Sequence, residues 1–152
     1  MLQLCQIIIV IGHRFTMLGL DKQSRLNKKL IKAIGQGETA RVKQLLDDGA
    51  SVEARTGFFK WRMTALAYAA WHGNQELVQL LLGHGAYVNA RDHSGDTPLI
   101  DALLKSQYLI AGLLLDHGAD ASITGGDGRQ AKNLAGGDDK LRRRIAGEPE
   151  PD

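Results

Sequence analysis

The sequence has little of several residue types on which common protein functions depend. Among its 152 residues there is one cysteine, and aromatic residues make up only 5% of the chain. The single cysteine, Cys5, excludes an internal disulfide framework and any metal site built from several cysteines. The formal net charge of +2 is too small to indicate binding to nucleic acid by itself.

Enzyme motifs are missing as well, since the chain shows no HExxH, CxxC, GxSxG or P-loop spacing. Its histidines do not converge: His84 and His117 occupy the same position in a repeat, near a helix end, where an imidazolium interacts favourably with the helix dipole. The glycine-rich residues 125–128 have no framing strand or phosphate-binding lysine, so we expect a turn there. We therefore expect no catalytic residues, no metal and no cofactor.

The N-terminal residues carry an apolar stretch, 2–11, that is far shorter than the roughly 18 residues of a membrane span. It also lacks the positively charged start and the clear cleavage site of a secretory signal. Three interpretations of residues 1–22 stay open: an extension outside the repeats, residues upstream of a true start at Met17, or a secretory signal within residues 1–16. We expect a cytoplasmic protein without a membrane span.

What the chain does contain is a repeat. The segment 45–55, LLDDGASVEAR, returns at 81–91 as LLGHGAYVNAR and, more altered, at 114–124 as LLDHGADASIT. The first two copies lie 36 residues apart and the last two 33 residues apart. A period near 33 residues is typical of a solenoid, in which each unit buries its apolar face against its neighbours.

Each unit reads as two helices followed by an extended finger that leads to the next unit. Thr97-Pro98 predicts a helix start. The threonine hydroxyl can cap free N–H groups, and proline is tolerated at the first helical position because a backbone N–H there would have no partner within the helix. Gly49, Gly85 and Gly118 predict the end of the second helix in a left-handed conformation. The predicted units span about 23–55, 56–91, 92–124 and 125–146, followed by an acidic, disordered tail over 147–152.

Several of these positions together resemble the ankyrin repeat: Thr97-Pro98-Leu99, Ala69-Ala70, Gly73-Asn74, Leu80-Leu81-Leu82, Gly85-Ala86 and Val88-Asn89-Ala90. The resemblance covers roughly residues 24–146, although Ala67 and Ile100 stand where the family often has histidine. It implies an all-α repeat solenoid of stacked antiparallel helix pairs with short β-hairpin fingers. About four repeats are implied, the first and last acting as caps. The family's concave face, made of fingers and first helices, usually binds protein partners.

The register breaks between the first two units, where the finger is longer. From Ala54 to Thr64 it takes ten steps, three more than the next finger, and it contains Phe58, Phe59 and Trp61. Clustered aromatic residues in a loop indicate a contact site, because loops normally turn polar side chains to water. Two alternatives stay open: the finger folds back and packs its aromatics locally, or it mediates self-association.

We predict a non-catalytic interaction module that binds a protein or peptide through the concave face and the extended aromatic finger, residues 55–63. Basic residues along this edge indicate an acidic segment on the partner, although Asp92, Asp96 and Asp127 dilute their field. The alternatives are a self-associating scaffold, such as a homodimer, and, less favoured, an adaptor that contacts nucleic acid. The predicted partner-binding residues are Phe58, Phe59, Trp61, Arg62, Trp71, His72, Arg91, His93, Lys105 and Arg129.

Overall fold

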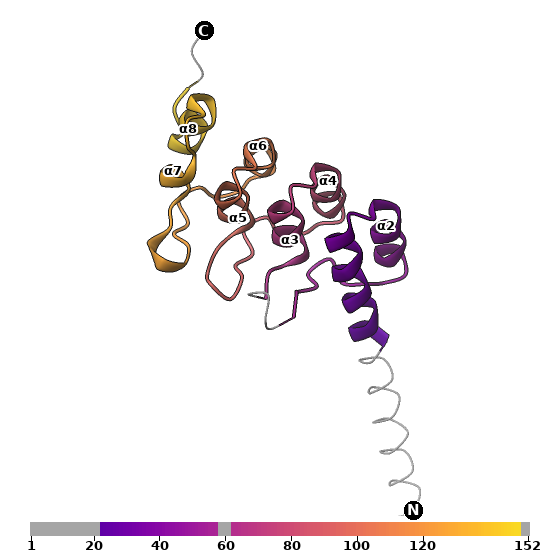
Figure 1. The fold of residues 1–152 in the computed structure, drawn as a ribbon. Helices are drawn as coiled ribbons and strands as arrows, with labels where there is room; N and C mark the ends of the chain where they lie inside the picture. The colour runs from indigo at the N-terminus through magenta and orange to yellow at the C-terminus, as the bar shows by residue number, and fades with distance from the viewer. Residues whose placement is uncertain (1–21, 58–61, 150–152) are drawn as a thin grey trace, which may run out of the picture.

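The computed structural model describes residues 22–57 and 62–149 of the chain, whose helices come in consecutive pairs (Figure 1). The first helices of the pairs are, in chain order, residues 22–36, α3 (Ala65–Trp71), α5 (Pro98–Leu104) and α7 (Ala131–Leu134). The second helices are α2 (Thr39–Asp47), α4 (Gln75–Gly83), α6 (Tyr108–Asp116) and α8 (Asp139–Ala146). A short 3₁₀ turn, η2 (Gly126–Gly128), precedes α7.

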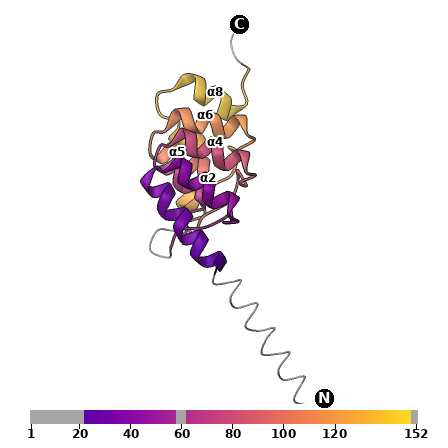
Figure 2. The same cartoon turned by 90° about the vertical axis from the view of Figure 1, so that its right-hand side faces the viewer.

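The pairs stack side by side in a single row. First helices pack on first helices, α3 on α5 and α5 on α7, while α2, α4, α6 and α8 pack on one another in series. Figure 2, turned by 90°, shows these second helices following one another along the stack. The prediction of an all-α repeat solenoid of helix pairs is therefore confirmed.

The core is continuous through the stack. One cluster of buried apolar side chains extends from Leu30 in the first pair to Leu141 in the last. The first helices approach closely because they are rich in small residues, and four alanines of α3 are buried: Ala65, Ala67, Ala69 and Ala70. Because this core crosses every joint, each unit depends on its neighbours for its own burial.

The helix starts and ends form where the sequence predicts them. Thr64 Oγ1 accepts a hydrogen bond from the backbone N–H of Ala67 at 3.1 Å, and Thr97 Oγ1 accepts one from Ile100 at 3.4 Å. The helices α2, α4 and α6 are each followed by a left-handed glycine, as predicted: Gly49, Gly85 and Gly118.

The fingers, residues 55–64, 91–97 and 124–130, join one pair to the next. Equivalent backbone hydrogen bonds close their bases: Thr56 N–H to Met63 O at 2.9 Å, Asp92 to Asp96 at 2.9 Å, and Gly125 to Arg129 at 2.7 Å. The extra residues of the first finger therefore lie between residues 56 and 63. Pairing of the β type in the described residues is limited to one isolated bridge between Arg55 and Thr64, so the predicted β-hairpins are minimal.

Two arginines at equivalent positions link the units, and we call these contacts the arginine series. Arg55 Nη1 donates to the carbonyl oxygen of Arg91 at 2.9 Å. Arg91 Nη2 donates in turn to the carbonyl oxygen of Thr124 at 2.5 Å. Since Arg55, Arg91 and Thr124 share one repeat position, each link reaches from one unit to the same position of the next.

A second set of links runs through side-chain oxygens that accept from equivalent backbone N–H groups. Asn27 accepts from Ser51 at 2.9 Å, Glu53 from Tyr87 at 2.8 Å, and Asn89 from Asp120 at 2.8 Å. Glu53 and Asn89 lie just before a finger, whereas Asn27 lies in the helix over residues 22–36. That helix therefore supplies, within the first unit, the acceptor that the preceding unit supplies to the second and third units.

An arginine of the last helix adds polar contacts between the last pair and its neighbour. Arg144 on α8 donates to Asp116 Oδ1 at 2.6 Å and to the carbonyl oxygen of Gly112 at 3.2 Å, both in α6. The N-terminal extension and its secretory-signal alternative lie outside the described residues, apart from position 22. The unit limits and the disordered tail remain predictions.

Candidate functional site

The fingers and the first helices lie on one side of the stack, and the second helices lie on the other (Figure 1). Two recesses open among the first helices and fingers in the described part of the chain. One lies between the helix over 22–36 and α3, and the other lies between α3 and α5. Tyr68 and Trp71, on the same helix, line different recesses. We name them the basic recess and the acidic recess.

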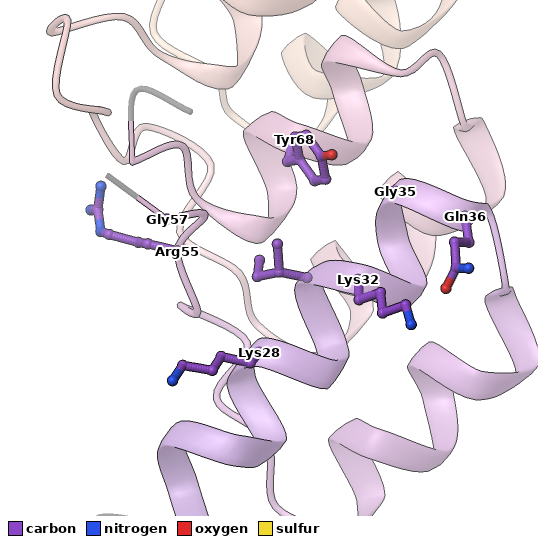
Figure 3. Close-up of a pocket in the computed structure, with 8 residues that line it drawn as sticks. Lys28, Lys32, Gly35, Gln36, Arg55, Gly57 and Tyr68 are labelled. Atoms are coloured by element: carbon purple, nitrogen blue, oxygen red, sulfur yellow. The ribbon is translucent and has the colours of Figure 1, made fainter. Parts of the chain in front are cut away.

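The basic recess has a volume of about 580 Å³ and combines an apolar surface with a cationic rim (Figure 3). Ile31 and Tyr68 provide the apolar surface, while Lys28, Lys32 and Arg55 provide the charge. No carboxylate is among the described residues that line it. Such a surface is complementary to an acidic segment that also carries an apolar side chain.

The acidic recess is smaller, about 230 Å³, and is lined by residues of all three fingers and of the helices α3 and α5. Met63, Trp71 and Leu104 form its apolar walls. Its charged lining consists of four carboxylates and one guanidinium: Asp92, Asp96, Asp101, Asp127 and Arg129. The recess therefore carries an excess of potential negative charge.

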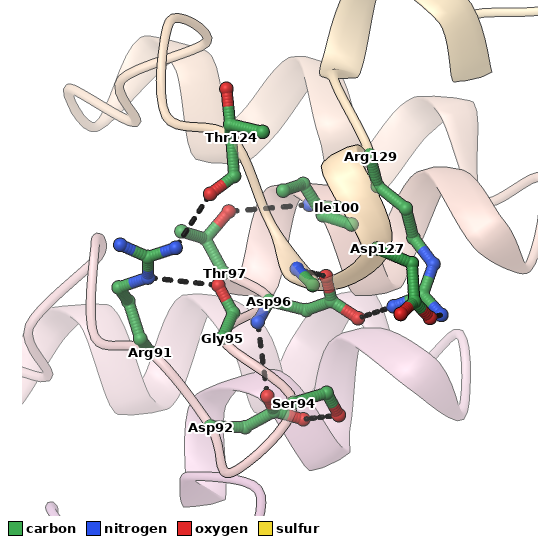
Figure 4. Close-up of polar contacts among 11 residues, drawn as sticks. Arg91, Asp92, Ser94, Gly95, Asp96, Thr97, Ile100, Thr124, Asp127 and Arg129 are labelled. Carbon is green, nitrogen blue, oxygen red and sulfur yellow. Dashed lines mark hydrogen bonds and ion pairs between the residues drawn. The ribbon is translucent and has the colours of Figure 1, made fainter.

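Part of that charge, carried by Asp96 and Arg129, holds the second and third fingers together (Figure 4). Arg129 Nη1 lies 2.5 Å from Asp96 Oδ2, and Nη2 lies 2.9 Å from Asp127 Oδ2. Asp96 Oδ1 also accepts the backbone N–H of Gly126 at 2.9 Å. Burial raises the pKa of the Asp96 carboxyl above its ordinary value, and the Gly126 amide and Arg129 oppose that rise.

Asp101 is the exception, because it lies in the same recess without such a partner. Its residue is 2% exposed, and Oδ2 accepts no hydrogen bond from any described residue. Burial, with smaller contributions from Asp92 and Asp96, raises the pKa of Asp101 to about 8. In the free protein at neutral pH this carboxyl is therefore mostly protonated.

Comparison with known proteins identifies the repeat. The family model of ankyrin repeats, in 3 copies, matches residues 4–92 and 30–124, which together make up most of the chain. The chain belongs to the ankyrin repeat family. Ankyrin repeats in general mediate contacts between proteins.

Proteins from animals and from a bacterium resemble this chain in sequence. The 2-5A-dependent ribonuclease of Mus musculus is 41% identical over 76 residues, which are 50% of this chain and 10% of that protein. A putative ankyrin repeat-containing protein of Treponema pallidum (strain Nichols) is 32% identical over 114 residues, 75% of this chain and 38% of that protein. The ankyrin repeat, SAM and basic leucine zipper domain-containing protein 1 of Oryctolagus cuniculus is 38% identical over 102 residues, 64% and 21% respectively. The chain thus spans well under half the length of each of these relatives.

Three of the predicted partner-binding residues gather where α3 of this ankyrin stack ends. The Lys105 Nζ lies 4.1 Å from the centroid of the Trp71 ring. His72 is the C-cap of α3, and its ring meets that of Tyr68 edge-on, with centroids 4.5 Å apart. The structure thus brings Trp71 and Lys105 together beside the acidic recess, and leaves His72 exposed next to them.

Two further predicted residues have contacts within the chain. Arg91 donates to the carbonyl oxygens of Gly95 and Thr124, at 2.8 and 2.5 Å (Figure 4). Arg129 is paired with Asp96 and Asp127, as described above. Both guanidinium groups therefore join neighbouring fingers, and their predicted contact with a partner stays a prediction.

The remaining predicted residues belong to finger tips. Arg62 and His93 are exposed, and Arg62 has a φ of 50°, with its carbonyl oxygen accepting from Arg55 at 3.2 Å. The three aromatic residues of the first finger lie outside the described residues: Phe58, Phe59 and Trp61. Their role as partner anchors remains a prediction from sequence.

Tyr68 and Asp101 line the recesses but were not predicted from the sequence, whereas Trp71 and Arg129 of the acidic recess were. Asp101 is the one charged residue in the otherwise apolar α5, PLIDALL, and this was the available signal. Tyr68 occupies the same position of the preceding unit. The basic recess could not be foreseen, because it forms only where Lys28 and Lys32 face the finger that follows α2.

The described residues show no arrangement of the kind that metal binding would need. No group of three or more His, Cys, Asp or Glu side chains among them is placed to hold a metal ion. Nor is any helix in this part of the chain long and apolar enough to cross a membrane. Ankyrin repeats are in general non-catalytic interaction modules, although the murine relative above bears the name of a ribonuclease.

Proposed function

We propose that this ankyrin repeat chain is a non-catalytic module that binds a protein or peptide partner through its concave face, formed by fingers and first helices. The basic recess carries the proposal. Ile31 and Tyr68 offer apolar surface, whose burial contributes about 25 cal/mol per Å², while Lys28, Lys32 and Arg55 select for acidic neighbours. The partner that suits it is a segment with an apolar side chain flanked by aspartate or glutamate.

The first finger belongs to the proposed binding face. Arg55 and Gly57 line the basic recess, so the finger borders it. Phe58, Phe59 and Trp61 enter the proposal on the sequence argument alone, as aromatic residues clustered in a loop. The sequence also favours a cytoplasmic protein.

Selection of peptides from a random display library tests the proposal. We expect the selected peptides to combine acidic with apolar residues, because the recess offers cations around an apolar surface. Lys28→Glu with Lys32→Glu should lower their affinity by about tenfold or more in fluorescence anisotropy, since like charges oppose binding. Lys43→Glu, on the exposed side of α2, is the matched control and should change affinity little.

Two results would contradict the proposal. One is an equal loss of affinity in the control variant, and the other is hydrogen-exchange protection by the peptides of α4 and α6 rather than of the first helices. Sedimentation of the free protein, with Trp61→Ala beside it, measures the alternative of a homodimer. A dimer that this substitution dissociates would support self-association through the finger.

A further inference from the structure

The charges of the acidic recess are unevenly satisfied. Arg129 is the one guanidinium in its lining, and both of its terminal nitrogens already contact carboxylates, those of Asp96 and Asp127. Asp92 closes its own finger, with Oδ1 accepting the backbone N–H of Asp96 at 3.0 Å and Oδ2 accepting from Ser94 Oγ at 3.3 Å. Asp101 alone is left with a buried oxygen that no described residue satisfies.

A buried acceptor without a donor costs free energy, and native structures seldom contain one. Asp101 lines a recess that opens to solvent, although the residue is 2% exposed, so a donor from outside the chain reaches Oδ2 when the side chains around it move slightly apart. The recess holds about 230 Å³, which suits one side chain and not a folded domain. What the site lacks is a cationic hydrogen-bond donor of side-chain size.

The aromatic wall of the recess suits the same kind of group. Lys105 places its ammonium group 4.1 Å from the centroid of the Trp71 ring, which is within the range of a cation–π contact. The chain's own residue thus shows that a face of this indole receives a cation. Arginine combines both requirements, because its planar guanidinium pairs with carboxylates and stacks on aromatic rings.

We propose that the acidic recess receives a guanidinium group from an arginine side chain of the partner, with Asp101 as its main anionic contact and Trp71 as its wall. The inference rests on the proposed function, because the arginine belongs to the segment bound on the same face. It adds a requirement to that partner: a basic residue next to the acidic and apolar segment that fits the basic recess.

Binding in this recess is coupled to a proton. The Asp101 carboxyl is mostly neutral in the free protein at pH 7, and a guanidinium beside it favours the ionised form, so binding releases a proton. Affinity for the guanidinium should therefore rise as pH increases toward about 8. The other charged groups around Asp101 are Asp92, Asp96, Asp127, Arg129 and Lys105.

N-acetyl-arginine amide, titrated into the whole chain, tests the site directly. The indole N–H resonance of Trp71, assigned with Trp71→Phe, is the readout. We expect a saturable shift with the arginine compound and none with the citrulline compound, which has nearly the same shape without the charge. Asp101→Asn should weaken binding by about tenfold or more and remove most of its pH dependence, whereas Asp48→Asn on the opposite side should change neither.

A second variant keeps the test independent of any effect of Asp101→Asn on folding. Lys105→Met removes the resident cation beside Trp71, so we expect the arginine compound to bind more tightly. Equal shifts with citrulline, or unchanged affinity in Asp101→Asn, would overturn the inference. Failure here differs from failure of the proposed function, because display-selected acidic peptides would still bind wild type and lose affinity in Lys28→Glu with Lys32→Glu.

Discussion

At the scale of single residues, Asp101 is held in a place that disfavours its charge. The unfolded chain leaves a carboxyl in water with an ordinary pKa of 3.8, whereas the folded chain buries it and raises that pKa to about 8. Between these values the folded state keeps a proton that the unfolded state loses. The free energy of unfolding of the wild type therefore falls as pH rises through this range, by at most about 1.4 kcal/mol per pH unit for this group.

Asp101→Asn should remove this dependence, because the amide has the shape of the carboxyl and cannot ionise. We expect the variant to gain stability over the wild type progressively from about pH 5 to about pH 8, as judged by urea unfolding at several pH values. The exposed Asp48→Asn is the control. A difference between variant and wild type that stays constant with pH would contradict the raised pKa.

Residues whose role depends on their immediate neighbours in the chain could be predicted from the sequence. Thr97 caps the helix that begins beside it, and Gly85 ends the helix just before it, because both effects act within a few residues. Asp101 could be noticed as a charge in an apolar run, but not placed. Its surroundings are made by fingers of two units, and the approach of those fingers is set by packing.

At the scale of elements, two fingers approach each other so closely at Gly126 that there is no room for a side chain. A Cβ atom added to Gly126 would collide with the backbone carbonyl oxygen of Ser94 in the preceding finger, and backbone cannot move aside cheaply. The sequence predicts a turn over residues 125–128, and it shows that the three extra residues of the first finger lie between Ala54 and Thr64. It gives no indication that Gly126 is needed for contact between fingers, because that contact spans 32 residues.

Gly126→Ala should therefore destabilise the protein by roughly 1–3 kcal/mol, the usual cost of forcing atoms into a packed contact. Gly137→Ala is the matched control, because nothing lies within 4 Å of a Cβ atom there, and we expect a change of about 0.5 kcal/mol or less. Thermal unfolding of both variants measures the difference. Equal stability of the two would show that the fingers separate without cost.

At the scale of the whole molecule, units touch only the units beside them, and stability is therefore local. Arg144→Ala removes the contacts of α8 with Asp116 and Gly112, at a cost of about 1 kcal/mol. We expect faster hydrogen exchange in α7, α8 and the adjoining α6, and unchanged exchange in α2 and α4. Arg143→Ala, exposed on the same helix, is the control. Faster exchange throughout the chain would contradict local stability.

The repeat period was sufficient to predict the solenoid, because a 33-residue unit has one way to bury its apolar face, against its neighbours. The repeat period did not predict the two recesses. They depend on side chains that differ from unit to unit, such as Lys28 and Asp101, and on the facing residue of the next unit.

The arginine series has a consequence for how such a chain can grow. Each arginine in it donates to a backbone carbonyl oxygen, Arg55 to that of Arg91 at 2.9 Å and Arg91 to that of Thr124 at 2.5 Å. Because the acceptor is backbone, the contact does not depend on the residue type at the receiving position. The series ends at Thr124, which has no guanidinium to extend it. If a unit were duplicated after Thr124 and arginine stood at position 124, that arginine could make the same contact with the backbone of the added unit. The arginine contact therefore leaves the residue type at the receiving position free to vary.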